Sequence, residues 1–159
     1  LLQKIYKPLL KESKTSLELV IDATKSMATS HTGALIVIHK NIDLGRFAET
    51  GEEIDSAISK RLLISIFNKN SPLHDGAVII QNDRIRAVRC SLPISENGTI
   101  SPNLGFRHRA AIGLSEQTDA AIIIVSEENG EIALAHTGAL NRKLTIADLE
   151  DSLYKYLQS

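Results

Sequence analysis

The chain has 159 residues, enough for one domain with a sizeable core, and its hydrophobic fraction of 43% is ordinary for a soluble globular protein. The formal net charge of −1, the absence of Trp and the few Phe and Tyr residues argue against general nucleic-acid binding. Cys90 is the only cysteine, which excludes an internal disulfide and favours a cytosolic setting. No apolar run approaches the roughly 20 residues that cross a bilayer, and no signal-peptide pattern occurs.

The first part of the chain is predicted to form a helix and then a buried strand. Thr15 and Glu18 have capping-box spacing, and apolar residues follow at helical intervals to about Ser30. Residues 33–39 carry Ala, Leu, Ile and Val without polar interruption, which is typical of a strand buried on both faces. We therefore expect this strand to be central in its sheet.

The next part is predicted to contain a second amphipathic helix. Residues 41–51 show no regular pattern, and apolar residues then recur at helical spacing from Ile54 to Ile66. We expect this helix to end near Asn68, because residues 69–72 form a turn that contains a proline.

Two hairpins and two further helices are predicted in the rest of the chain. The strands are expected over residues 77–80, 85–92, 120–125 and 131–135, with turns at Asn82-Asp83 and Asn129-Gly130. Small residues from Ala110 to Leu114 predict a helix start between the hairpins, and residues 145–148 open the last helix. The element order predicts a mixed α/β fold, a single domain in which helices cover one central mixed sheet.

Arg107, His108 and Arg109 stand between the loop-forming Gly105 and the predicted helix start at Ala110. The first turn of a helix has unpaired N–H groups and the positive end of the dipole, so cations there are unfavourable unless an anion lies between them. Two guanidinium groups and backbone N–H groups suit a polyphosphate in particular. The alternative is a solvated basic turn.

Asp75 and Gly76 precede the predicted strand over residues 77–80. A carboxylate that faces bound phosphates is tolerable only with a divalent cation between them, so Asp75 is a candidate metal ligand. The Asp-Gly pair is equally consistent with a simple turn. The neighbouring His74 fits either a Mn²⁺ ligand or a cap of the loop.

Ser126, Glu127 and Glu128 follow another buried strand just before a hairpin turn. Their oxygens could face a ligand at the edge of the sheet, although solvated turn charges are the more common meaning of this pattern. The chain has no P-loop, dinucleotide-binding fingerprint, H-E-x-x-H zinc motif or G-x-S-x-G elbow.

The sequences Asp75-Gly76-Ala77 and Arg107-His108-Arg109 together resemble the DGA and RHR motifs of the diadenylate cyclase family. Segments that begin at Glu49, Asn70, Arg109 and Val125 resemble family segments in the same order, so the resemblance covers nearly the whole chain. It implies that two ATP molecules are condensed into cyclic di-AMP with release of two pyrophosphates. It also implies a divalent cation, Mn²⁺, Mg²⁺ or Co²⁺.

The resemblance is closest to the membrane-tethered members of the family, in which transmembrane helices precede a cytoplasmic cyclase domain. Residues 1–15 would then be a membrane-proximal segment, and residues 16–159 would be the diadenylate cyclase domain. This implies a cytoplasmic domain of a membrane-anchored protein, with the tethering segment upstream.

The resemblance also assigns the site residues. Asp75 is implied to act at the 3′-hydroxyl and the metal, and Arg107, His108 and Arg109 to face the triphosphate as catalytic residues. His74 and Glu128 are implied to bind the metal, with Glu128 acting across a subunit interface. The residues implied to bind the nucleotide are Gly76, Ala77, Leu92, Phe106 and Ser126.

Two positions depart from the family pattern. Phe106 stands where many relatives carry a small hydroxyl residue, and Ser91 stands where tethered relatives often carry an aromatic residue. Both substitutions change contacts to the adenine or the phosphates.

The reaction itself favours a homodimer. Each 3′-oxygen must attack the other nucleotide, so two subunits whose nucleotide-binding faces meet convert a bimolecular encounter into a positioned one. Three alternatives remain open: a non-catalytic adenine-nucleotide sensor, a partner-binding domain whose arginines pair with protein carboxylates, and a phosphodiesterase, which usually needs clustered His and Asp ligands.

Overall fold

A mixed sheet organises residues 14–159, which are the part of the chain that the computed structural model describes. The elements in chain order are α2 (Ser16–Thr29), β1 (Ala34–Ile38), α3 (Gly45–Ala48), β2 (Glu52–Ala57), α4 (Lys60–Phe67), β3 (Ala77–Gln81), β4 (Arg84–Cys90), α5 (Phe106–Gln117), β5 (Ala121–Val125), β6 (Ile132–His136), β7 (Ala139–Asn141) and α6 (Ile146–Gln158). Apart from Lys14 and Thr15, the predicted membrane-proximal segment lies outside the described residues. Within residues 14–159, none of the helices has the length and apolar character needed to span a membrane.

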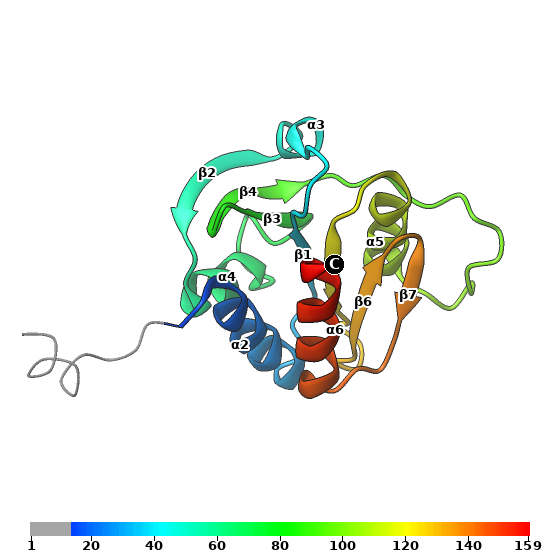
Figure 1. Ribbon diagram of the computed structural model, residues 1–159. Coiled ribbons are helices and arrows are strands. Elements are labelled where there is room, and N and C mark those ends of the chain that lie inside the picture. The colour runs from blue at the N-terminus through cyan, green and yellow to red at the C-terminus, as the bar shows by residue number, and fades with distance from the viewer. Residues whose placement is uncertain (1–13) are drawn as a thin grey trace, which may run out of the picture.

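The sheet has seven strands in these residues, in the order β2-β4-β3-β1-β5-β6-β7. Strand β1 pairs parallel with β3, and every other neighbouring pair is antiparallel. The prediction of one mixed sheet covered by helices is therefore confirmed, as is the central position of β1 (Figure 1).

Helices cover both faces of the sheet and bury two hydrophobic layers. Helices α2, α4 and α6 pack on one face, and α3 and α5 pack on the other (Figure 1). Successive residues of β1 point to opposite layers: Ile36 and Ile38 join the first, and Leu35 and Val37 join the second. Both faces are covered, which explains why this strand is an uninterrupted apolar run.

Most of the predicted elements are confirmed. Thr15 caps α2 by accepting a hydrogen bond from the Glu18 backbone N–H, and Thr145 and Asp148 form the capping box of α6. Strands β3 and β4 form the first predicted hairpin, and β5 and β6 form the second.

The predicted helix from Ile54 is wrong in its first half. Residues 52–57 form β2, an exposed edge strand paired with β4, and α4 begins only after Ser59, whose side chain accepts a hydrogen bond from the Leu62 N–H. The helical spacing of apolar residues in β2 is accidental because almost none of them is buried. Helix α3 and strand β7 were also not predicted, since elements of four and three residues carry too few positions for a period to show.

Helix α5 is enclosed on two sides, by the sheet and by the loop that follows β4. A Cβ at Gly113 would lie 1.9 Å from the Pro93 carbonyl oxygen, so the loop crosses the helix with no room for a side chain. The Ser95 N–H also donates to the carbonyl oxygen of Arg109 at 3.1 Å. These contacts fix the start of α5 relative to the sheet.

Gly76→Ala is expected to destabilise the fold by about 2 kcal/mol or more, because Gly76 has a φ of +116° and a Cβ there would lie 2.8 Å from backbone atoms of Arg89 and Cys90. Gly98→Ala is the control, since no atom lies within 4 Å of its Cβ position. Urea unfolding of both variants measures the difference. Equal losses of stability would contradict the steric argument.

Candidate functional site

The strand register brings several chain segments to one edge of the sheet. Ala34 at the start of β1 pairs with Val125 at the end of β5, and Ala77 at the start of β3 pairs with Cys90 at the end of β4. Val125 also pairs with Ile132 at the start of β6. The loops that precede β1, β3 and β6 and follow β4 and β5 therefore meet at this edge.

A cleft at this edge has two adjoining lobes. The β4 lobe, of about 520 Å³, is lined by Leu35, residues 50–52, Asp75, Gly76, residues 89–92, Phe106 and Ala110. The α5 lobe, of about 510 Å³, is lined by Leu35, residues 74–76, residues 103–108, residues 125–129, Glu131 and Arg142. Both volumes lie within the usual range for small-molecule sites. Asp75, Gly76, Phe106 and Leu35 belong to both lobes and so form their junction.

The cleft gathers most of the residues selected from the sequence. His74, Asp75, Arg107, His108, Ser126 and Glu128 line the α5 lobe, Leu92 lines the β4 lobe, and Gly76 and Phe106 line both. Two selected residues, Ala77 and Arg109, line neither lobe. Ala77 is fully buried beneath the cleft, where β3 pairs with β4.

The start of α5 combines side-chain and backbone positive charge. Its first turn contains no acidic residue, and its N-cap, Gly105, has no side chain to accept a hydrogen bond. The Nη1 atom of Arg107 lies 3.6 Å from Oε1 of Glu127, a residue that is mostly exposed. A single loose ion pair of this kind offsets little charge. The turn therefore remains suited to binding an anion.

The guanidinium group of Arg107 lies directly against Gly33. A Cβ at Gly33 would lie 2.5 Å from the Cζ atom of Arg107. Any side chain at residue 33 would thus displace the guanidinium group. The sequence offered no sign of this constraint, because Gly33 and Arg107 are far apart in the chain.

His108 is a buried side chain at the start of α5. Its side chain is 9% exposed, and burial, followed by the positive charge of Arg142, lowers its pKa, although Glu131 acts in the opposite direction. A bound polyphosphate would reverse the effect by favouring the charged imidazole.

Arg109 supports the loop that leads into α5. Its Nε donates to the Leu104 carbonyl oxygen at 3.3 Å, and its Nη2 donates to the Ser101 carbonyl oxygen at 3.2 Å. Arg109 thus lies beside the cleft and lines neither lobe, and its contact with a triphosphate stays a prediction.

His74 and Asp75 are chemically suited to a divalent cation. The Nδ1 atom of His74 lies 2.8 Å from the Ser71 carbonyl oxygen, which leaves Nε2 for another partner. Residues 14–159 contain no group of three or more His, Cys, Asp or Glu side chains arranged to hold a metal. An ion held by His74 and Asp75 would need its remaining ligands from phosphate oxygens and water.

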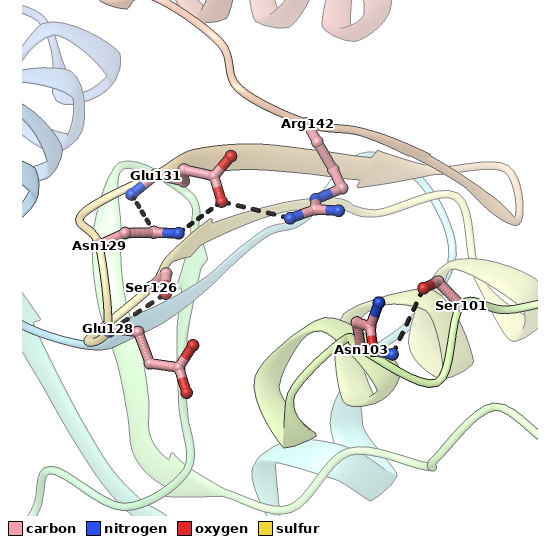
Figure 2. A network of polar contacts seen from close by, with 7 residues as sticks. All are labelled: Ser101, Asn103, Ser126, Glu128, Asn129, Glu131 and Arg142. Carbon is pink, nitrogen blue, oxygen red and sulfur yellow. Dashed lines mark hydrogen bonds and ion pairs between the residues drawn. The ribbon is translucent and has the colours of Figure 1, made fainter.

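The turn between β5 and β6 presents the Ser126 hydroxyl to the α5 lobe (Figure 2). Ser126 Oγ accepts a hydrogen bond from the Glu128 N–H at 3.2 Å, which leaves the hydroxyl proton for another acceptor. The Ser126 N–H donates to the Glu131 carbonyl oxygen at 3.0 Å, and the Gly130 N–H donates to the Ser126 carbonyl oxygen at the same distance. These bonds position the turn.

Several lining residues had not been identified from the sequence. Leu35, Cys90 and Ala110 give the β4 lobe apolar walls, and burial raises the pKa of the Cys90 thiol to about 11, so it is not a nucleophile at neutral pH. Glu131 and Arg142 line the α5 lobe. Strand pairing and the packing of α5 on the sheet bring these residues to the cleft.

The family model described as DisA bacterial checkpoint controller nucleotide-binding, abbreviated DAC, matches residues 21–140. The chain belongs to this family. It is 44% identical over 146 residues to cyclic di-AMP synthase CdaA of Bacillus subtilis, covering 92% of this chain and 54% of that protein. The DAC chain thus spans about half the length of this relative.

Two crystal structures also resemble this DAC domain. A double mutant of DacA from Staphylococcus aureus has a TM-score of 0.87 and 44% identity, with 91% of this chain and 96% of that chain covered. A hypothetical membrane spanning protein from Bacillus cereus has a TM-score of 0.79 and 37% identity, with 89% of this chain and 69% of that chain covered.

The DAC domain is expected to lose thermal stability as the pH falls from 7.5 to 5.5. The pKa values of His108 and His136 are lowered in the folded state, mainly by burial, so the unfolded chain binds more protons once the pH drops through about 6.5. Melting temperatures of the wild type, His108→Asn and His136→Asn at both pH values measure the effect. Each variant should lose less stability on acidification than the wild type does. An unchanged pH dependence in both variants would contradict the assignment.

Proposed function

We propose that this chain is the catalytic domain of a diadenylate cyclase, which condenses two ATP molecules into cyclic di-AMP and releases two pyrophosphates. The observation that carries the proposal is the position of Asp75 at the junction of the two lobes. One lobe has apolar walls that suit a purine, and the other ends at the cationic first turn of α5. The similarity to a cyclic di-AMP synthase supports the same reaction.

The two lobes suggest how one ATP lies in the cleft. The adenine occupies the β4 lobe between Leu92 and Phe106, whose 69% exposed ring offers a face for stacking. The ribose lies over Gly76, where the missing side chain permits close approach. The triphosphate enters the α5 lobe, toward Arg107, His108 and the Ser126 hydroxyl.

A divalent cation, Mn²⁺, Mg²⁺ or Co²⁺, is proposed to accompany the nucleotide. The α5 lobe is lined by the carboxylates of Asp75, Glu127, Glu128 and Glu131, which would repel a polyphosphate. Asp75 and His74 would hold the ion, and Glu128 would contribute from the partner subunit. When bound, the ion neutralises phosphate charge and makes the 3′-hydroxyl easier to deprotonate.

The residues of the cleft have distinct parts in the reaction. Asp75 accepts the proton of the 3′-hydroxyl as the 3′-oxygen forms a bond to the α-phosphorus of the other ATP. The bond from that phosphorus to the bridging oxygen breaks, and pyrophosphate leaves in line. Arg107 and the N–H groups at the start of α5 stabilise the charge that develops on the pyrophosphate. Two such steps close the ring.

A homodimer completes the site, because each subunit holds one ATP and the reacting groups belong to different nucleotides. When the nucleotide-binding faces of two subunits meet, the 3′-oxygen of each ATP lies against the α-phosphorus of the other ATP. The exposed ring of Phe106 at the mouth of the cleft would be covered in this arrangement.

The whole protein is proposed to be anchored in a membrane by a segment upstream of this domain, which would lie on the cytoplasmic side. The similarity to a protein described as membrane spanning supports this arrangement.

Asp75→Asn is expected to lower cyclic di-AMP formation by about 10² to 10⁴-fold, because the group that accepts the 3′-hydroxyl proton is lost. The melting temperature should stay close to the wild type, and turnover is compared at saturating ATP because Asp75 also holds the proposed ion. Asp151→Asn, on the exposed face of α6 outside the cleft, is the matched control. Chromatography of the nucleotides after incubation with Mn²⁺ or Mg²⁺ measures turnover.

Two results of that experiment would contradict the proposal. Parent-level turnover by Asp75→Asn would refute the role of Asp75. A wild-type chain that binds ATP and forms no product would instead be a nucleotide sensor.

Mixing wild-type chain with an excess of Asp75→Asn is expected to produce the linear dinucleotide in place of cyclic di-AMP. In a mixed dimer only one 3′-hydroxyl has its proton acceptor, so the first bond forms and the ring does not close. Mass spectrometry distinguishes the linear and cyclic products. If the mixture makes only cyclic product, in proportion to the wild-type chain, then the two sites of a dimer do not cooperate in this way.

A further inference from the structure

Arg142 lies in the α5 lobe although it belongs to no motif of the sequence. It directly follows β7, an edge strand of the sheet, and it lines the same lobe as Arg107, His108 and Ser126. Figure 2 shows its guanidinium group directed toward Glu131, across the strands from the Ser126 turn. The lobe therefore has a second guanidinium group besides that of Arg107.

The guanidinium of Arg142 is only partly used within the described residues. Its Nη2 donates to Oε2 of Glu131 at 3.2 Å, and the same oxygen accepts a shorter bond, 2.8 Å, from Nδ2 of Asn129. The side chain of Arg142 is 42% exposed. A guanidinium has five N–H donors, so most of those of Arg142 remain available to a ligand.

The contact between Arg142 and Glu131 does not have the form of a strong structural bridge. A strong bridge between arginine and a carboxylate uses two parallel hydrogen bonds and both carboxylate oxygens. Oε1 of Glu131 is buried and has no hydrogen-bond partner in the part of the chain that the structure describes. Asn129 rather than Arg142 is the main cause of the lowered pKa of Glu131.

The charge of Arg142 reaches the rest of the lobe. After burial, Arg142 is the largest influence that lowers the pKa of His108, ahead of Arg107. Positive charge therefore reaches this lobe from a residue that follows β7 as well as from the start of α5. A polyanion in the lobe would lie in the field of both guanidinium groups.

The strand order shows which part of a nucleotide Arg142 would meet. Asp75 precedes β3, Ser126 follows β5 and Arg142 follows β7, so the strand order runs from the carboxylate through the Ser126 turn to Arg142. Neighbouring strands are about 4.8 Å apart. With the ribose at Asp75, a triphosphate that extends along this edge directs its β and γ phosphates toward Arg142.

We propose that Arg142 is a further substrate-contacting residue that binds the β and γ phosphates of ATP, and hence the departing pyrophosphate. This inference rests on the proposed function, because it takes the ribose to lie at Asp75. The pair with Glu131 then holds the arginine in the lobe before the nucleotide arrives.

The test compares two ligands by calorimetry with Mg²⁺ present: α,β-methylene-ATP, which cannot release pyrophosphate, and AMP, which lacks the two outer phosphates. Arg142→Met should weaken binding of the triphosphate by about tenfold or more, because a charge-assisted hydrogen bond is lost. Its affinity for AMP should be unchanged. Lys143→Met is the matched control, since Lys143 is exposed and does not line the cleft, and neither ligand should distinguish it from the wild type.

Glu131→Gln separates phosphate binding from a structural role of Arg142. If Arg142 contacts phosphate, removing the charge of Glu131 should leave triphosphate affinity equal or higher. In this variant Arg142 binds the phosphate without first giving up an ion pair with a carboxylate. If Arg142 only ties β7 to β6, Glu131→Gln should weaken binding as Arg142→Met does. That result, or equal losses for the triphosphate and AMP in Arg142→Met, would overturn the inference.

Failure of the proposed function has a different signature. A wild-type chain that binds neither ligand and forms no cyclic di-AMP refutes both proposals. A wild-type chain that cyclises ATP while Arg142→Met keeps full triphosphate affinity refutes only the role of Arg142.

Discussion

The pairing of β1 with β3 on one side and β5 on the other is the constraint on which the site depends. Because β1 runs parallel to β3 and antiparallel to β5, the start of β3 and the end of β5 reach the same edge of the sheet. Asp75 and Ser126, which are 51 residues apart in the sequence, therefore line one cleft. The buried core of β1 makes this register costly to change, since a shift by one residue would turn its apolar side chains toward the wrong layers.

Both negatively and positively charged side chains line the cleft, and this suits a ligand that binds together with a divalent cation. Carboxylates and guanidinium groups line the same α5 lobe, and the two arginines there each pair with a glutamate of the β5–β6 turn. In each pair one partner is well exposed to solvent, which weakens the attraction, so a polyphosphate can replace the glutamate. A divalent ion then offsets the carboxylates that the phosphates would otherwise face. The same lobe is thus complementary to a metal–nucleotide complex.

The chemical character of a candidate residue was more predictable from the sequence than the direction in which its side chain points. Asp75, Arg107 and Ser126 were selected from their residue types and neighbours, and all three line the cleft. Arg109 was selected by the same reasoning, and in the structure its guanidinium donates to loop carbonyl groups and lines neither lobe. Arg142 could not be selected, because no local pattern marks a residue that reaches the site through strand pairing alone.

The sequence by itself determined the elements whose burial leaves a periodic or unbroken apolar pattern, namely α2, β1, both hairpins and α6. It also determined the family, since the two short motifs and their order are carried by contiguous residues. The tertiary structure alone decided that residues 52–57 are an edge strand, because exposed positions carry no pattern of burial. It also decided which polar side chains share the cleft, since that depends on strand order and register. Local sequence specifies local conformation, whereas a site is defined by contacts between segments far apart in the chain.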